Sequence, residues 1–455
     1  MGSDRLLCVY DAGSARLCRG HDSPMRRIIR AATKIEPNEL KATILSFLFV
    51  FTLMAAYFIL RPVRDALSSD WTDAELSWLW TSTFFFSLVA VSVYGVVISR
   101  VQFKNLVPGV YAFFSLSFFV FFFGSTFVEN PIYVDKSFYV WLSVFSLFHV
   151  SVFWSFMSDL FSRNQAPRLF GIIATGASAG AIVGPTIPTF FADTLGATNL
   201  MLIAAVMLLI PIVIIRELEK IKASELGNED AQADLSTQQA IGKNPFAGFD
   251  MFFRSRYLLG IGVFILCYVA ISTFVYFEIK NLLVDVDRDV RTQIWGGIDL
   301  AVNSLAIVTA VFVTGRIATR FGMSTTLALI PVLIVFGLLI VAVAPVISVV
   351  VGLQIARRAG NYAITRPGRE MLFTVVDRET RFKAKPVIDI VVYRGGDMVN
   401  AWAFTALTTG LGLGLGAVAA VGAAIAAVWA VVGVYLGRSY HRTAAAAEAG
   451  AVPVE

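Results

Sequence analysis

The amino-acid sequence predicts an all-α integral membrane protein with twelve transmembrane helices arranged in two six-helix bundles. Of its 455 residues, 57% are hydrophobic and only 15% are charged, whereas a soluble protein carries about a quarter charged residues. Phe occurs 38 times, and a water-soluble fold of this size could not bury so much apolar surface. The basic residues, in addition, recur between apolar segments at regular intervals. These observations exclude a soluble domain.

Twelve apolar segments are long enough to cross a bilayer, which takes about 20 residues. In chain order, the predicted spans 1 to 12 are 41–62, 76–99, 106–127, 137–158, 169–192, 198–216, 257–279, 292–315, 324–345, 346–365, 391–411 and 413–436. Spans 9 and 10 are separated by little more than Pro345, and spans 11 and 12 by a glycine-rich join. Eleven or thirteen spans are the alternatives.

The distribution of lysine and arginine favours the even count. In membrane proteins the cytoplasmic joins carry the excess of these residues. In this chain they concentrate in the two tails and in every second join, at Arg26, Arg27, Arg30, Arg100, Lys104, Arg163, Arg168, Arg216, Lys220, Lys222, Lys243, Arg254, Arg256, Arg316, Arg320, Arg378, Arg381, Lys383, Lys385, Arg438 and Arg442. An odd number of spans would disrupt this pattern. We therefore expect a multi-pass protein of the cell inner (plasma) membrane with cytoplasmic N- and C-termini.

The chain divides into two halves around one long polar segment. We predict a cytoplasmic tail over 1–40, a six-helix bundle over 41–216, a cytoplasmic linker over 217–256, a second bundle over 257–436 and a cytoplasmic tail over 437–455. The N-terminal tail lacks the long apolar core of a secretory signal. For residues 1–24, an extension upstream of Met25 is one interpretation and a transit peptide is the other.

Metal and nucleic-acid functions have no support in the sequence. The three Cys and three His residues are scattered without metal-ligand spacing, so we expect no metal, no cofactor and no catalytic residue set. The net charge of +5 is modest, and a basic excess of this size is typical of the cytoplasmic face of a membrane protein. We expect no nucleic-acid partner.

Charged residues lie where span 1 ends. A charged side chain within a span is costly unless it faces a cavity or a partner. Tyr57, Arg61, Arg64, Asp65 and Ser68 fall on one helical face, which places two guanidiniums and one carboxylate on one stripe. Pro62 predicts a kink there. The alternative interpretation is an ordinary loop cluster just beyond the helix.

Span 10 carries a second basic face. Arg357 and Arg358 lie deep in the span, and Arg358, Tyr362, Arg366 and Arg369 share one helical face. The alternative is a shorter helix in which these arginines anchor the inner membrane face. Span 4 contains His149, and span 7 ends near Glu278. Polar residues thus concentrate on spans 1, 4, 7 and 10, with Asp299 and Asn303 on span 8 in addition.

Span 5 predicts close helix packing. Gly176, Gly180 and Gly184 are spaced by four residues and Pro185 follows. Small residues at this spacing let helix backbones approach closely. A gating helix and a statically packed helix are both compatible with this pattern.

Several motifs resemble known transporter families. Gly184–Pro185 resembles the fifth-helix motif of exchangers in the major facilitator superfamily, and Gly315–Gly322 resembles that superfamily's loop motif without its acidic residue. The segments Leu60–Leu67, Phe153–Asp159, Arg168–Gly171 and Arg366–Met371, followed by Asp377, Lys383, Lys385 and Asp389, resemble the nucleotide exchange translocases, the ATP:ADP antiporters of plastids and intracellular bacteria. The resemblance extends in order from about residue 38 to 410.

The resemblance implies a facilitator-like fold and the exchange of anionic solutes. In that family, basic residues of the first helix and after the tenth engage phosphate, and these positions match Arg64 and Arg369. The family's acid in helix 4 has no counterpart near Leu142, and its acid in helix 7 falls near Tyr276, with Glu278 as a loose substitute. Another phosphate-bearing metabolite is therefore the alternative to ATP and ADP.

The hypothesis from the sequence is alternating access by a secondary transporter. A small anionic solute would bind among Arg61, Arg64, Arg357, Arg358 and Arg369, with Asp65 and Glu278 pairing with these arginines when the site is empty. The alternatives are a facilitator of another solute and a membrane-embedded enzyme acting on lipids. We expect a monomer whose partners are the solute and the bilayer.

Overall fold

The structure is a computed structural model that describes residues 35–98, 103–162, 164–226, 247–310, 315–376, 384 and 387–448. Most of the predicted N-terminal tail and the middle of the predicted linker therefore lie outside the described residues. The same applies to Cys8, Cys18, His21, Met25, Arg26, Arg27, Arg30, Arg100, Arg163, Lys243, Asp377, Arg378, Arg381, Lys383 and Lys385.

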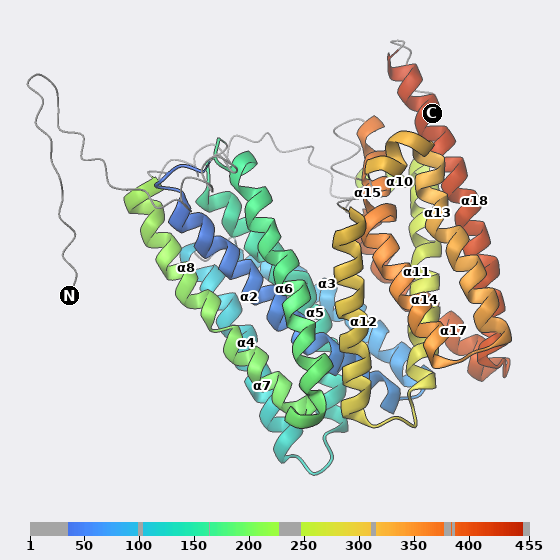
Figure 1. The fold of residues 1–455 in the computed structure, drawn as a ribbon, viewed down its shortest axis with the longest axis horizontal. Helices are drawn as coiled ribbons and strands as arrows, with labels where there is room; N and C mark the ends of the chain where they lie inside the picture. The colour runs from blue at the N-terminus through green and yellow to red at the C-terminus, as the bar shows by residue number, and fades with distance from the viewer. Residues whose placement is uncertain are drawn as a thin grey trace, which may run out of the picture.

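The first half of the chain forms a bundle of six membrane-crossing segments (Figure 1). They are α2 (Leu40–Leu67), α3 (Asp73–Ile98), α4 (Phe103–Phe127), α5 (Ile132–Leu160), α6 (Ala166–Leu195), and α7 (Ala197–Met207) continued by α8 (Ile210–Ile221). A short helix η1 (Ser68–Asp70) follows α2, and η2 (Lys222–Leu226) follows α8. The predicted spans of this half match these segments to within a few residues.

The second half forms another bundle of six segments (Figure 1). After α10 (Ala247–Arg254) they are α11 (Arg256–Leu282), α12 (Arg288–Thr309), α13 (Gly315–Val343), α14 (Ile347–Gly360), α17 (Tyr393–Thr405) and α18 (Leu415–Glu448). Short elements extend α14 through η4 (Asn361–Thr365), α15 (Arg366–Leu372) and η5 (Phe373–Val375), and they flank α17 as η6 (Val387–Val392) and η7 (Ala406–Gly410).

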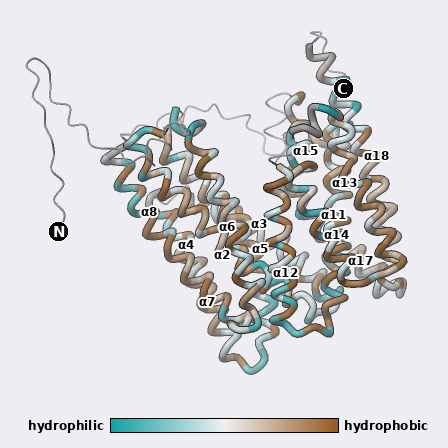
Figure 2. Tube along the Cα trace, in the orientation of Figure 1, coloured by the Kyte–Doolittle hydropathy of each residue, from teal (hydrophilic) through white to brown (hydrophobic). Residues whose placement is uncertain are grey.

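The fold is the predicted all-α membrane architecture. Within the described residues, nine helices are long and apolar enough to cross a bilayer. The remaining segments are α12, α14 and α17, which are shorter or carry more charge. Figure 2 shows hydrophobic residues along the middle of the helices and hydrophilic residues towards their ends. Several of the charged residues in these three segments, such as Arg357, Arg358, Arg394 and Asp397, line a cavity that is described below.

Two helix ends differ from the predictions in ways that matter. α2 continues through Pro62 to Leu67, so Arg64 and Asp65 belong to the helix and the alternative of a loop cluster is wrong. The helix continues although an interior proline removes one backbone hydrogen bond. α18 continues to Glu448, about three turns beyond the predicted end of span 12 at residue 436.

Glycines set the contact between α2 and α6. A Cβ added at Gly176 would lie 2.5 Å from the carbonyl oxygen of Phe47, and one at Gly184 would lie 2.6 Å from that of Ala55. The backbone of α6 therefore rests directly on α2. α6 continues through Pro185 to Leu195. The close packing predicted for this helix is present in the structure.

The two bundles diverge at one end and meet at the other (Figure 1). They diverge at the end where α2 begins and α18 ends. At the opposite end, α12 packs against α6 and α2, and α17 packs against α3. A Cβ at Gly296 of α12 would lie 2.8 Å from the hydroxyl of Thr189 in α6. The bundles are thus in contact at one end and lie apart at the other.

Candidate functional site

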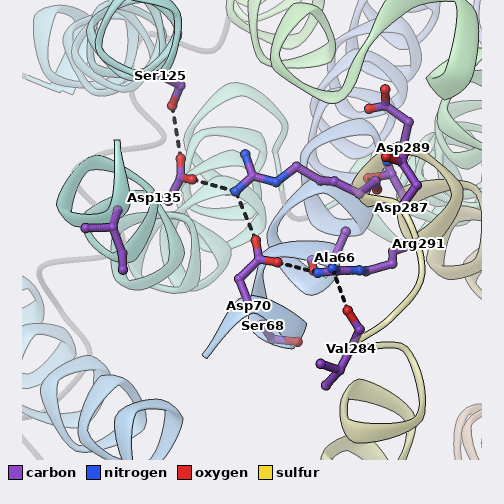
Figure 3. A network of polar contacts seen from close by, with 12 residues as sticks. Ala66, Ser68, Asp70, Ser125, Asp135, Val284, Asp287, Asp289 and Arg291 are labelled. Atoms are coloured by element: carbon purple, nitrogen blue, oxygen red, sulfur yellow. Dashed lines mark hydrogen bonds and ion pairs between the residues drawn. The ribbon is translucent and has the colours of Figure 1, made fainter. Parts of the chain in front are cut away.

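Charged residues hold the closed end together (Figure 3). Arg291 of α12 pairs with Asp70 of η1 at 2.5 Å and also donates to the carbonyl of Ala66 at 3.3 Å. Arg288 bridges Asp70 at 3.0 Å and Asp135 of α5 at 2.8 Å. This cluster, which we call the end network, joins three elements of the first bundle to α12.

A second group of contacts reinforces the same end. Lys280 of α11 pairs with Asp73 of α3 at 2.8 Å and donates to the carbonyl of Trp71 at 2.7 Å. Thr408 of η7 donates to the other oxygen of Asp73 at 2.8 Å. Buried charges persist only when they are paired and hydrogen-bonded, and Lys280 is 1% exposed. Separating the bundles here would break several such pairs at once.

A large polar cavity lies between the bundles, with a volume of about 770 Å³. It is lined by α2, α3 and α5 from the first bundle and by α11, α14, η4, α15 and α17 from the second. Seven arginines line it within the described part of the chain: Arg61, Arg64, Arg357, Arg358, Arg366, Arg369 and Arg394. Six tyrosines also line it: Tyr57, Tyr139, Tyr268, Tyr276, Tyr362 and Tyr393.

Asp65 organises the arginines of α2. Its carboxylate accepts from Arg64 at 2.6 and 2.9 Å and lies 3.5 Å from Arg61. Arg64 also donates to Ser143 of α5 at 3.3 Å and lies over the ring of Tyr139, 5.3 Å from its centroid. These contacts fix both guanidiniums of α2 towards the cavity.

A chain of hydrogen bonds crosses from α3 to α2 through both bundles. The indole of Trp80 donates to the hydroxyl of Tyr139 at 2.8 Å, and the hydroxyls of Tyr139 and Tyr276 lie 3.2 Å apart. Tyr276 of α11 donates to Asp65 at 3.2 Å. The second bundle thus contacts the charged face of the first through a tyrosine hydroxyl.

Asp299 of α12 connects arginines of both bundles. It pairs with Arg358 of α14 at 2.6 Å and lies 3.5 Å from Arg61 of α2. Asp299 is 1% exposed and Arg358 is 3% exposed. Because a buried ion that loses its partner is strongly destabilised, this shared carboxylate links the cavity to the contact between the bundles.

Other arginines of the second bundle have weaker or neutral partners. Arg357 donates to the amide oxygen of Gln354 at 2.7 Å and lies over the ring of Tyr268. Its Nη1 has no hydrogen-bond partner among the described residues, and neither has Nη2 of Arg358. Arg394 lies 3.8 Å from Asp397. Donors of this kind remain available to a ligand.

The charges of the cavity do not balance. Seven guanidiniums face four carboxylates among the described residues, namely Asp65, Asp299, Glu370 and Asp397. The formal excess is three positive charges. A guanidinium presents a planar fork of donors that matches carboxylate and phosphate oxygens, so the arrangement suits a multiply charged anion.

The structure gathers most of the predicted site residues at this cavity. Arg61, Arg64, Arg357, Arg358, Tyr362, Arg366 and Arg369 line it, and Asp65 lies directly behind. The alternative of arginines anchored at the inner membrane face is wrong for Arg357 and Arg358, because both are buried within the protein.

Two predicted residues lie elsewhere. His149 stacks behind Tyr57, with ring centroids 4.6 Å apart, and does not line the cavity. Glu278 is fully buried, and its carboxylate has no hydrogen-bond partner among the described residues. The predicted pairing of Glu278 with the cavity arginines is therefore wrong. Tyr276 faces the cavity, and two residues along a helix correspond to a turn of about 200°, which places Glu278 on the opposite face of α11.

Four charged residues of the cavity, Asp299, Glu370, Arg394 and Asp397, were missing from the predicted site. The sequence marks Asp299 as a charged residue within a span, but no sequence signal predicts its ion pairs with Arg358 and Arg61. Arg394 and Asp397 lie three residues apart in an otherwise apolar span. Charge within a span was the signal used for Arg357, and the same signal could have identified this pair.

Two bundles of apolar helices with a charged cavity between them are typical of a membrane transporter. Residues 43–363 match the Major Facilitator Superfamily, which is more than half of the chain. The protein belongs to this superfamily and is a secondary transporter rather than an enzyme.

Solved structures with a similar fold agree with this assignment. One is a bacterial homologue of the human lysosomal transporter Spinster in an inward-facing, unoccupied conformation, with 13% identity, a TM-score of 0.53, and coverage of 90% of this chain and 97% of that one. Another is a POT family transporter in complex with a thioalcohol-conjugated peptide, with 11% identity, a TM-score of 0.58, and coverage of 88% and 96%. No curated protein matches the sequence.

Proposed function

We propose that the protein exchanges anionic, phosphate-bearing solutes, nucleotides such as ATP and ADP among them, across the cell inner membrane. The observation that carries the proposal is the excess of three positive charges in a cavity shared by both bundles. Arginine forks bind phosphate oxygens in a bidentate manner, and tyrosine rings on the cavity wall offer faces for stacking a base.

The same excess favours exchange over unidirectional transport. To reorient, a carrier must enclose its cavity, and transfer of unpaired ions out of water costs several kcal/mol per ion. A solute with about three negative charges would neutralise the arginines during this step. The empty carrier would keep its charges unpaired, so reorientation would be fast only when an anion is bound.

The direction of opening follows from the positive-inside pattern. If the N- and C-termini are cytoplasmic, the end at which the bundles diverge faces the cytoplasm and the end network faces outward. The structure then corresponds to an inward-open state. We propose that the protein acts as a monomer, because the two six-helix bundles of one chain enclose a complete cavity.

The test is counterflow into liposomes that contain the purified protein. Liposomes loaded with ADP should accumulate labelled ATP, and empty liposomes should not. The Arg64→Ala, Arg369→Ala double variant should lose most of the exchange, whereas Arg216→Ala, which removes an exposed arginine of α8, should not.

The outcomes separate the role of the residues from the choice of substrate. Equal exchange by the double variant would refute the assigned role of the cavity. If nucleotides fail, sugar phosphates and organic acids tested in the same liposomes decide whether another anion is the substrate. Accumulation of a neutral solute or a peptide in preference to every anion would contradict the proposal.

A further inference from the structure

A second hollow lies on the surface of the C-terminal bundle, between α13 and α18. Its volume is about 420 Å³, and α18 lies at the margin of the molecule farthest from the first bundle (Figure 1). Ala328 and Ala430 are nearly buried at its floor, while Val332 and Val431 are exposed beside them. It shares no lining residue with the central cavity. We call it the α13–α18 groove.

The groove arises from close contact of the two helices. A Cβ at Gly433 would lie 3.0 Å from the carbonyl oxygen of Leu327, and Gly437 packs directly against Ser324. The backbones touch at these glycines. Beside this line of contact, alanines replace larger side chains, and the space they leave is open to the surroundings of the bundle. In a membrane-spanning segment, those surroundings are lipid chains.

The mouth of the groove is cationic. Arg438 and Arg442 line it and are exposed, one helical turn apart on α18, with Ser439 beside them. No carboxylate lines the groove among the described residues. They lie at the end of α18 where the bundles diverge (Figure 1). This is the level at which a lipid headgroup meets a spanning helix.

We propose that the α13–α18 groove binds one anionic phospholipid from the leaflet at that end of the molecule. An acyl chain would lie along the valines and alanines, and the headgroup phosphate would contact Arg438 and Arg442. Basic pockets between spanning helices bind anionic headgroups in this manner. A zwitterionic lipid would bring a quaternary amine towards the same arginines, which the like charge opposes.

The experiment is native mass spectrometry of the full purified chain in neutral detergent with phosphatidylglycerol or phosphatidylcholine of identical acyl chains. The wild type should retain phosphatidylglycerol in preference. The Arg438→Gln, Arg442→Gln variant should bind it about 25-fold more weakly, because each arginine near an anionic headgroup contributes roughly a fivefold gain. Arg216→Gln removes an exposed arginine of α8, outside the groove. This variant should bind phosphatidylglycerol as the wild type does.

A second variant tests the acyl part of the groove without changing charge. Val431→Trp should fill the hollow and reduce retention of phosphatidylglycerol, while the melting temperature stays near that of the wild type because Val431 is exposed. Equal retention of both lipids would overturn the proposal, as would an equal loss in Arg216→Gln. Displacement of the lipid by inorganic phosphate at millimolar concentration would show that a free anion occupies the mouth, and would overturn it too.

Discussion

Replacement of Asp299 by asparagine should separate substrate binding from the return of the empty carrier. Asp299→Asn keeps the size of the side chain but removes the carboxylate that Arg358 contacts at 2.6 Å and Arg61 at 3.5 Å. The formal excess in the cavity then rises from three positive charges to four. Without substrate, the variant holds a buried guanidinium with no ionic partner.

The expected magnitudes follow from these distances. Breaking a buried pair by removing one partner costs about 3–5 kcal/mol, so the free variant should unfold at a lower temperature than the wild type. In the wild type, a phosphate about 6 Å from Asp299 is repelled by roughly 3 kcal/mol at an effective dielectric constant of 20. Removing this repulsion should tighten anion binding by at least about tenfold after solvent screening.

Thermal unfolding of the purified protein, with and without nucleotide, measures both effects. The melting temperature of the variant should be lower than that of the wild type without nucleotide and should rise more when nucleotide is added. In counterflow, labelled ATP should exchange at lower concentrations. Asp193→Asn removes an exposed carboxylate of α6 and should change neither quantity. If Asp299→Asn weakens nucleotide binding, Asp299 does not compete with the substrate for Arg358 and the account of the empty state is refuted.

Three further changes test other parts of the structure. Arg291→Gln should open the end network, because loss of an arginine from a hydrogen-bonded charge pair with Asp70 costs roughly 2 kcal/mol and shifts the closed-to-open ratio about thirtyfold. Gly180→Val should destabilise the protein by about 1–3 kcal/mol, since a Cβ there would lie 2.9 Å from Cβ of Met54; the control is Gly171→Val, where the structure leaves open space. Glu278→Gln should leave the KM for exchange unchanged within about twofold and should not lower the melting temperature, because it removes a buried carboxylate that has no partner among the described residues.

Each of these has its own readout. For Arg291→Gln, spin labels at Tyr133 and Val290, both exposed at the closed end, should report a longer distance. An unchanged distance distribution would show that the end network does not hold this end closed. For the glycines, equal melting temperatures of the two variants would show that α6 does not depend on contact with α2. For Glu278→Gln, a loss of exchange would place this residue in the transport cycle.

The arginine faces could be predicted because helical spacing determines them. Arg358, Tyr362, Arg366 and Arg369 were expected on one face, and all four line the cavity although the helix passes through the η4 segment between them. The length of α2 could not be predicted as well, because a proline close to an apolar segment's end is equally typical of a helix end.

Pairings between distant helices could not be read from the sequence. Asp299 and Arg61 are brought together only by the packing of α12 against α2, and no local pattern encodes that contact. Glu278 was assigned to the cavity because of its position near the end of a span. Tyr276, two residues before it, faces the cavity instead, and a choice between the faces of a mostly apolar helix needs the positions of the surrounding helices.

The most direct test of the central claim is an experimental structure of the full chain with saturating ATP. The account predicts density for the phosphate groups inside the cavity, within hydrogen-bonding distance of Arg61, Arg64 and Arg358, with Asp299 displaced from at least one of its two guanidiniums. An empty cavity at saturating ligand, or phosphates bound away from these arginines, would contradict it.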